Sequence, residues 1–375
     1  MSIISPFKFG RVVTGDSFIN RKDEKNRIRN NILSRNNTII ISPRRWGKSS
    51  LMRQVAGEME SDKIRFAFLD IYNIRTEEDF FTAYSREIIK ATITRKEEIL
   101  NMAKKFFKRM VPVISFKVDP LHDLSLKFNW EEAKEAIDEM IDLPEKIAKD
   151  KGLKIVVCID EFQNIARIRD YEKLEDTLRS FWQLHEQVSY CLFGSKKHMM
   201  VDIFNRESRP FYRFGDIIML GKILEEHWID FIVSGFKDSG KSIPPELAKT
   251  LISTAGNHPE YVQQLAHHTW SLTEKLADEL VLNNAVEMVL NSNSIFYQEI
   301  CDDLSNTQIN LMKAVFQGET QFTSADVMRK YNLGTPRNVS KNKETLDVKD
   351  IIDFSAEPVQ FTDPFFIIWF QRTFL

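Results

Sequence analysis

Long apolar runs, paired cysteines and an excess of either charge are all missing from this sequence of 375 residues. No segment reaches the roughly 18 uninterrupted apolar residues of a membrane-spanning helix, so we expect no membrane partner. The three cysteines (Cys158, Cys191 and Cys301) include no C-x-x-C pair, which argues against a disulfide framework or a cysteine zinc site and is typical of a reducing cytoplasm. Because 52 Lys and Arg nearly balance 54 Asp and Glu, any contact with nucleic acid must come from a local patch.

What the sequence does have is the composition of a globular protein, with 43% hydrophobic and 28% charged residues. Its length predicts two or three domains. It also has two stretches related to the phosphate-binding pattern G-x-x-x-x-G-K-[ST]. GFKDSGKS (235–242) fits at every position, and SPRRWGKS (42–49) fails at the first.

The complete match has the wrong surroundings. A phosphate loop needs a buried strand before it and a helix after it, whose free N–H groups face the phosphates. The residues before Gly235 have helical apolar spacing, and Ile243 is followed by two prolines, which are incompatible with a helix starting at Lys241. We therefore predict that Gly235 and Gly240 mark the end of one helix and the turn to the next.

The incomplete match has the right surroundings. The run 38–41 (TIII) is β-branched and suits a buried parallel strand, and apolar spacing after Ser49 predicts a helix. Gly47 would let the backbone approach the phosphates, Lys48 would reach the β- and γ-phosphates, and Ser49 would ligate Mg²⁺. The candidate nucleotide-binding residues are Ser42, Pro43, Arg44, Arg45, Trp46, Gly47, Lys48, Ser49 and Ser50. The alternative is a chance GKS in a strand-to-helix turn.

A second motif supports this choice. The stretch 153–162 (LKIVVCIDEF) is a near-continuous apolar strand that ends in two acids, at the edge where open α/β sheets bind ligands. Asp160 would hold Mg²⁺, and Glu161 would orient and deprotonate the attacking water. The alternative for this motif is an ordinary strand followed by an acidic turn.

Three more apolar stretches (64–72, 188–195 and 216–223) complete a predicted five-stranded parallel sheet, the α/β fold of a P-loop NTPase. The strand ending at Ser195 should lie between the two motif strands. Its terminal hydroxyl could sense the γ-phosphate or the attacking water, although a simple Gly-Ser turn explains it equally well.

Together, FINRKDE, SPRRWGKSSL, IDEFQ, FGS, YRFGDI and AGNHPEYVQQL resemble the archaeal-type ATPases, AAA+-related NTPases grouped with the STAND class. The resemblance spans nearly the whole chain and implies an AAA+-like core, a helical lid and a C-terminal winged helix-turn-helix. It also implies that Arg21 lies near the adenine, and that Arg213 reaches phosphate in cis or from a neighbouring subunit. The turn before Pro259 would open a lid helix near the base. Each of these three residues also has a purely structural explanation. The lid shows no arginine like the second sensor of AAA+ motors, which argues against a processive motor.

The predicted winged helix, from Ser305 onward, carries eight Lys/Arg and eight Asp/Glu. This neutrality favours protein contacts over DNA, because DNA-binding winged helices are usually basic. Residues 87–152 form a predicted helical insert whose helix NMAKKFFKRM gathers Lys104, Lys105, Lys108 and Arg109. A solvated face is the favoured interpretation, and a phosphate-binding patch is the alternative.

The sequence thus predicts a P-loop ATPase core (1–222), a helical lid (223–306) and a winged helix (307–375). We expect an ATP-driven switch, with Mg-ATP held between core and lid and slowly hydrolysed. Nucleotide-dependent homo-oligomers and an unidentified protein partner fit this function. One alternative is an ATP-dependent DNA-binding protein of the initiator or transposition-helper type, and another is a nucleotide-stabilised scaffold without turnover.

Overall fold

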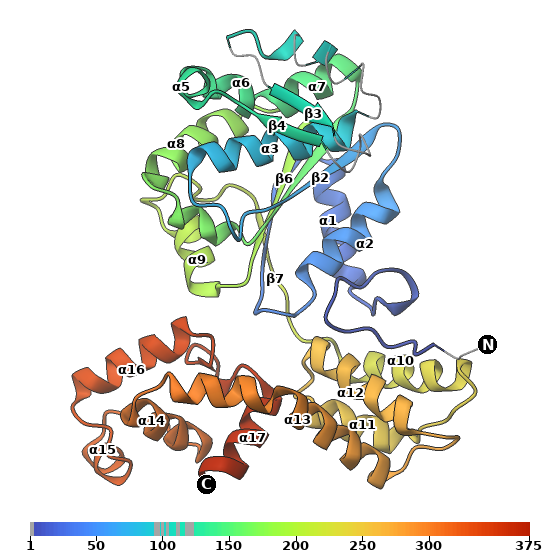
Figure 1. Cartoon of the computed structure of the whole chain (residues 1–375), viewed down its shortest axis with the longest axis vertical. Helices are drawn as coiled ribbons and strands as arrows, with labels where there is room; N and C mark the ends of the chain where they lie inside the picture. The colour runs from blue at the N-terminus through green and yellow to red at the C-terminus, as the bar shows by residue number, and fades with distance from the viewer. Residues whose placement is uncertain (1–3, 94–97, 99–100, 103–104, 110–112, 117–123) are drawn as a thin grey trace. The chain divides into compact units, whose positions relative to one another are not determined.

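The computed structural model describes residues 4–375 except 94–97, 99–100, 103–104, 110–112 and 117–123. The chain divides into two compact units (Figure 1). One unit is Val12–Gly221, and the other combines the N-terminal segment up to Arg11 with Lys222–Leu375. The chain therefore passes from one unit to the other twice. The predicted boundary between lid and winged helix, near Asn306, remains a prediction.

A five-stranded parallel sheet organises the unit Val12–Gly221, as predicted. Its strands lie in the order β2-β5-β6-β1-β7, which places β6 between the two motif strands as expected. The bounds are β1 Thr38–Ile41, β2 Ile64–Asp70, β5 Lys154–Asp160, β6 Val188–Gly194 and β7 Asp216–Met219.

Helices cover both faces of this sheet, which explains the near-continuous apolar strands. Alternate residues of β1 face opposite ways: Ile40 packs with helices α1 and α2, whereas Ile39 and Ile41 join the larger core on the other face. The helices of this unit are α1 Lys22–Leu33, α2 Lys48–Met59, α3 Glu77–Thr92, α5 Trp130–Ala133, α6 Ile137–Ile141, α7 Leu143–Lys151, α8 Tyr171–Trp182 and α9 Lys197–Asn205. Three 3-10 turns accompany them: η1 Gly15–Ser17, η2 Lys134–Ala136 and η3 Phe162–Arg167.

The predicted helical insert contains a feature that the sequence did not reveal. Two short strands, β3 Val113–Phe116 and β4 Leu124–Lys127, pair antiparallel within it. Unlike the four residues of β1, neither stretch is a continuous run of β-branched residues, and the alternation over four residues is too short to be recognised from sequence.

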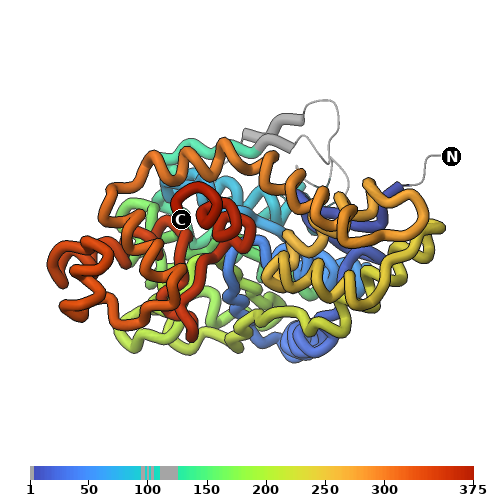
Figure 2. Tube along the Cα trace, turned by 90° about the horizontal axis from the view of Figure 1, so that it is seen from below, coloured from blue at the N-terminus to red at the C-terminus, as the bar shows by residue number. Residues whose placement is uncertain are grey.

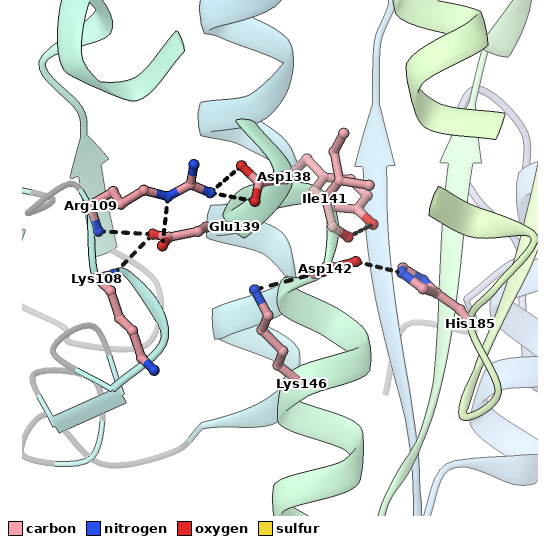
Figure 3. Close-up of polar contacts among 9 residues, drawn as sticks. Lys108, Arg109, Asp138, Glu139, Ile141, Asp142, Lys146 and His185 are labelled. Carbon is pink, nitrogen blue, oxygen red and sulfur yellow. Dashed lines mark hydrogen bonds and ion pairs between the residues drawn. The ribbon is translucent and has the colours of Figure 1, made fainter. Parts of the chain in front are cut away.

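Lys105 and Arg109, two of the four basic residues that the sequence brings together in the insert, pair with acids of the same unit. The side chain of Lys108 is exposed, and its main-chain N–H donates to Glu139 Oε2 at 2.9 Å. Arg109 pairs with Asp138, and its Nε lies 3.3 Å from Glu139 Oε1 (Figure 3). Lys105 pairs with Asp150. Lys104, part of the predicted helix, lies outside the described residues. These internal ion pairs favour a structural role over a phosphate-binding patch.

The second unit is helical apart from one small hairpin. Its helices are α10 Glu225–Asp238, α11 Pro245–Thr254, α12 Pro259–Leu272, α13 Glu279–Asp302, α14 Asn306–Phe316, α15 Ala325–Lys330, α16 Pro336–Val348 and α17 Pro364–Phe374. Strands β8 Ile352–Asp353 and β9 Gln360–Phe361 form the predicted wing. The C-terminal α17, red in Figure 2, lies beside the orange α13. The Tyr297 ring of α13 contacts Phe366 and Trp369 of α17. Among the described residues, no helix combines the length and apolarity that crossing a membrane requires.

Candidate functional site

The loop from β1 to α2 has the backbone form of a phosphate cradle. Ser42 is buried at the end of β1, and α2 begins at Lys48 with Gly47 as its N-cap. Gly47 has φ +88°, a conformation that glycine adopts without strain. Lys48 is only 5% exposed, so its charge stays close to the start of the helix. The free N–H groups of a helix N-terminus favour anions, and a buried lysine beside them strengthens that preference.

The two predicted magnesium ligands meet at the carboxyl edge of the sheet. Ser49 Oγ donates a hydrogen bond to Asp160 Oδ2 at 2.5 Å. Burial raises the pKa of Asp160 above its ordinary value, while the Ser49 hydrogen bond and the Lys48 charge lower it. A half-buried carboxylate beside a hydroxyl is an oxygen pair that suits Mg²⁺, which keeps several waters and needs few protein ligands. The residues present therefore fit this ion.

Glu161 is fixed by both its backbone and its side chain. It adopts φ 54°, which is unusual for a residue other than glycine, and its N–H donates to Asp160 Oδ1 at 2.8 Å. Its Oε2 accepts hydrogen bonds from Ser195 Oγ at 2.8 Å and from Gln163 Nε2 at 2.5 Å. The structure thus brings Lys48, Ser49, Asp160, Glu161 and Ser195 into one cluster. The sequence had not singled out Gln163 as a site residue, although it stands two positions after Glu161.

Arg213 lies at the other edge of the sheet. It is exposed and stands three residues before β7 begins, and its main-chain N–H donates a hydrogen bond to Phe204 O. Because β7 runs parallel to β1, with Asp216 opposite Thr38, this is the amino edge, whereas the P-loop follows the carboxyl edge. The length of β1 separates the two, about 13 Å at 3.3 Å per residue. This placement does not support a contact in cis, and contact from a second copy stays a prediction.

Arg21 is not a solvated surface residue. It is 5% exposed and donates from Nη1 to Glu24 Oε1 at 2.9 Å, while its Nη2 is buried without a partner in the described part of the chain. Burial lowers its pKa. A buried, unpaired guanidinium nitrogen is unusual enough to need an explanation. That Arg21 lies near the adenine of a bound nucleotide remains a prediction.

The other candidates line the same loop or lie elsewhere. Pro43, Arg44 and Trp46 belong to the loop between β1 and α2, as does Arg45, which has φ 61°. Ser50, in the first turn of α2, accepts a hydrogen bond from Val13 N at 2.9 Å.

The predicted turn before Pro259 is present in the second unit, with Pro259 opening α12. Gly256 has φ +60°, and a Cβ added there would meet Pro364 at 2.9 Å. Packing against α17 is therefore sufficient to explain this glycine.

The complete match to the phosphate pattern is not a phosphate loop. Gly235 lies inside α10, where a Cβ would meet the Phe7 ring at 2.9 Å, and Gly240 forms the following turn with φ +74°. Lys241 Nζ donates to Trp270 O at 2.7 Å and lies 4.1 Å from the Trp270 ring centroid. Each of these residues thus has a structural role in the helical unit.

The sequence also gave no sign of the path taken by the N-terminal segment. Gly15 N donates to Gln54 Oε1 at 2.8 Å, so this segment runs along α2. Earlier in the segment, Lys8 N donates to Gln263 Oε1 at 2.9 Å and Gly10 N to Glu260 Oε1 at 3.2 Å, both on α12. Main-chain hydrogen bonds of this kind have no residue signature, which is why sequence patterns do not predict them.

Comparisons with known proteins agree with this geometry. Residues 18–265 match the family described as an ATPase domain predominantly from Archaea, and residues 295–372 match a probable winged helix domain. No curated protein matched the sequence.

Several solved structures share the fold at low sequence identity. The Walker-type ATPase of Pyrococcus abyssi is 14% identical with a TM-score of 0.69, and the alignment covers 98% of this chain and 99% of that one. The ORC2 protein of Aeropyrum pernix, solved with ADPNP and ADP, is 14% identical with a TM-score of 0.58 and 98% coverage of both chains. The ORC1 protein of the same organism, solved with DNA, is 10% identical with a TM-score of 0.50, covering 96% and 94%. With the family match spanning most of its length, this chain belongs to the family of ATPase domains found predominantly in Archaea.

Proposed function

We propose that this protein is an ATP-driven molecular switch of the STAND/AAA+-like type, with slow Mg²⁺-dependent hydrolysis. The observation that carries the proposal is the cluster at the carboxyl edge of the sheet, where Ser49 meets Asp160 and the next residue, Glu161, is held by Ser195. Family membership supports nucleotide binding in general. ATP, Mg²⁺ and the switch itself are the parts that we propose.

Each residue of the cluster has a distinct task in this proposal. Lys48 and the loop N–H groups bind the phosphates, and Ser49 and Asp160 would hold Mg²⁺, which supplies charge neutralisation when bound. Glu161 orients a water and accepts its proton as the water oxygen bonds to the γ-phosphorus and the bond to ADP breaks. Arg213 of a second copy would stabilise the charge on the transferred group, which makes a nucleotide-dependent oligomer part of the proposal.

The N-terminal segment supports the switch. It is bonded to α2, the helix that follows the phosphate loop, through Val13 and Gly15, and to α12 through Lys8 and Gly10. Few residues separate the two sets of bonds. A displacement of α2 on nucleotide binding would therefore act directly on this segment, which is one of the two connections between the units.

Small-angle scattering in two nucleotide states tests the switch. We expect Glu161→Gln with Mg-ATP to differ in radius of gyration from wild type with Mg-ADP, because the γ-phosphate should bias the arrangement of the units. Lys48→Ala serves as the control, in which the difference should disappear. Identical scattering with both nucleotides bound would contradict the switch and leave the nucleotide-stabilised scaffold.

A DNA-binding function is the second candidate, because the ORC1 relative was solved with DNA and this chain carries a winged helix domain. The residues of α16 give it little support. Lys343 Nζ lies 5.4 and 5.1 Å from the ring centroids of Phe322 and Phe354. The exposed Arg337 and Lys341 share the helix with acids such as Glu344. ATP-stimulated, salt-sensitive binding to duplex DNA would reverse this order of preference.

A further inference from the structure

We propose that Gln163 is a positioning residue that orients the Glu161 carboxylate for its task as general base. The inference rests on the proposed function, which assigns that task to Glu161. Both hydrogen bonds from side chains reach the same oxygen, Oε2, from Gln163 Nε2 at 2.5 Å and from Ser195 Oγ at 2.8 Å. Within the described residues, Oε1 has no hydrogen-bond partner. One oxygen of the carboxylate is thus held and the other is left to meet a water.

The amide of Gln163 can face only one way. Gln163 is 1% exposed, and its Oε1 is buried without a partner in the described part of the chain. A flipped amide would place its oxygen against the Glu161 carboxylate, and two acceptors would repel each other. An unpaired buried oxygen is unfavourable and rare. Its presence here indicates that the donor toward Glu161 is what the site requires.

Gly194 makes room for this arrangement. A Cβ added at Gly194 would lie 2.1 Å from Gln163 Oε1 and 2.6 Å from the sulfur of Met200. Only a glycine at this strand end leaves room for the Gln163 amide beside the backbone of β6. This close approach also explains why the FGS stretch has a glycine, because Gly194 does not adopt the positive φ that favours glycine.

The backbone beneath Gln163 is anchored. Phe162, which precedes it, is fully buried, and its ring centroid lies 5.7 and 5.5 Å from those of Phe204 and Phe211. Asn164 N donates to Glu161 O at 2.8 Å and closes the turn. Because both of its neighbours in the chain are held in place, the backbone of Gln163 is fixed and its side chain has a defined position beside Glu161. Holding a reacting group within a fraction of an ångström of its working geometry contributes substantially to rate.

Gln163→Met tests the inference, because methionine matches the length and volume of glutamine but donates no hydrogen bond. We expect kcat for ATP hydrolysis to fall about ten-fold, while KM and ATP affinity stay within about two-fold of wild type, since the residue touches the base and not the nucleotide. Asn164→Leu is the matched control, because it removes a neighbouring buried amide that has no contact with the Glu161 side chain, and its kcat should change little. Should Gln163→Met fail to fold, Gly194→Ala displaces the same amide from the other side and should give the same loss.

A double variant separates positioning from a structural role. In a Glu161→Gln background, Gln163→Met should cause no further loss of residual turnover, because the group that it positions is gone. A further ten-fold loss in that background would overturn the inference, as would a Gln163→Met kcat within two-fold of wild type. If Glu161→Gln alone leaves turnover unchanged, the proposed function fails as well, whereas an inactive Glu161→Gln beside a normal Gln163→Met overturns this inference only.

Discussion

Lys48→Ala is expected to weaken nucleotide binding by about 100-fold or more, whereas Lys241→Ala is expected to leave it unchanged. Lys48 is buried at the start of α2 and is proposed to pair with the phosphates of the nucleotide. Removing one partner of such a desolvated charge pair costs several kcal/mol of binding free energy. Lys241 instead bonds to Trp270 O and lies over the Trp270 ring, so its loss should lower the free energy of unfolding by about 1 kcal/mol. Calorimetric titration with Mg-ADP, beside thermal unfolding, measures both effects.

The two lysines are matched controls for each other, since both stand in a GKS triplet. The expected phenotypes are opposite: lost binding with a stable fold for Lys48→Ala, and normal binding with a less stable fold for Lys241→Ala. Nucleotide binding lost in Lys241→Ala but kept in Lys48→Ala would show that the phosphate loop is Gly235–Ser242 and that the geometry has been misread.

Asp160→Asn is expected to change activity and stability in opposite directions. Turnover should fall about 100-fold or more, because the residue proposed to hold Mg²⁺ loses its charge. The melting temperature without nucleotide or metal should rise at pH 8. Burial raises the pKa of Asp160, and Glu161 beside it adds to that rise, so the ionised side chain is unfavourable in the folded protein.

The pH dependence of the stability gain in Asp160→Asn follows from the upward shift of the Asp160 pKa. A group with a raised pKa in the folded state contributes stability at low pH that is lost as the pH rises through that pKa. The advantage of Asp160→Asn should therefore be largest at pH 8 and should shrink as the pH falls toward the raised pKa of the wild-type carboxyl. Asp70→Asn is the control, because Asp70 is the exposed register partner of Asp160 on β2. An Asp160→Asn protein that is less stable at pH 8 would contradict the interpretation.

Much of the nucleotide-binding unit could be predicted because its chemistry is local. Strands buried on both faces must be apolar throughout, so runs such as 153–162 stand out, and the polar residues that end them mark the carboxyl edge. The two GKS triplets could be told apart for the same reason, since the double proline after Ile243 excludes a helix there.

The rest depends on contacts between residues far apart in sequence or on backbone geometry. The placement of Gln163 depends on the space beside Gly194, at the end of β6. The placement of Arg213 at the amino edge follows from the direction of β7 beside β1. The main-chain bonds of the N-terminal segment leave no pattern at all. Arg21 shows the same limit, because nothing in the residues around this N-cap of α1 indicates that it is only 5% exposed.

Steady-state hydrolysis of ATP with Mg²⁺ by wild type, Glu161→Gln and Asp70→Asn tests whether Glu161 is the general base of an ATPase. Asp70 ends the neighbouring strand β2 and has no place in the proposed chemistry, so its variant controls for the loss of a carboxylate at this edge. We expect slow turnover in wild type and Asp70→Asn, and a loss of about 100-fold in Glu161→Gln with ATP binding retained. Equal turnover in wild type and Glu161→Gln, or bound ATP with no turnover in any of the three proteins, would show that Glu161 is not the general base of an ATPase.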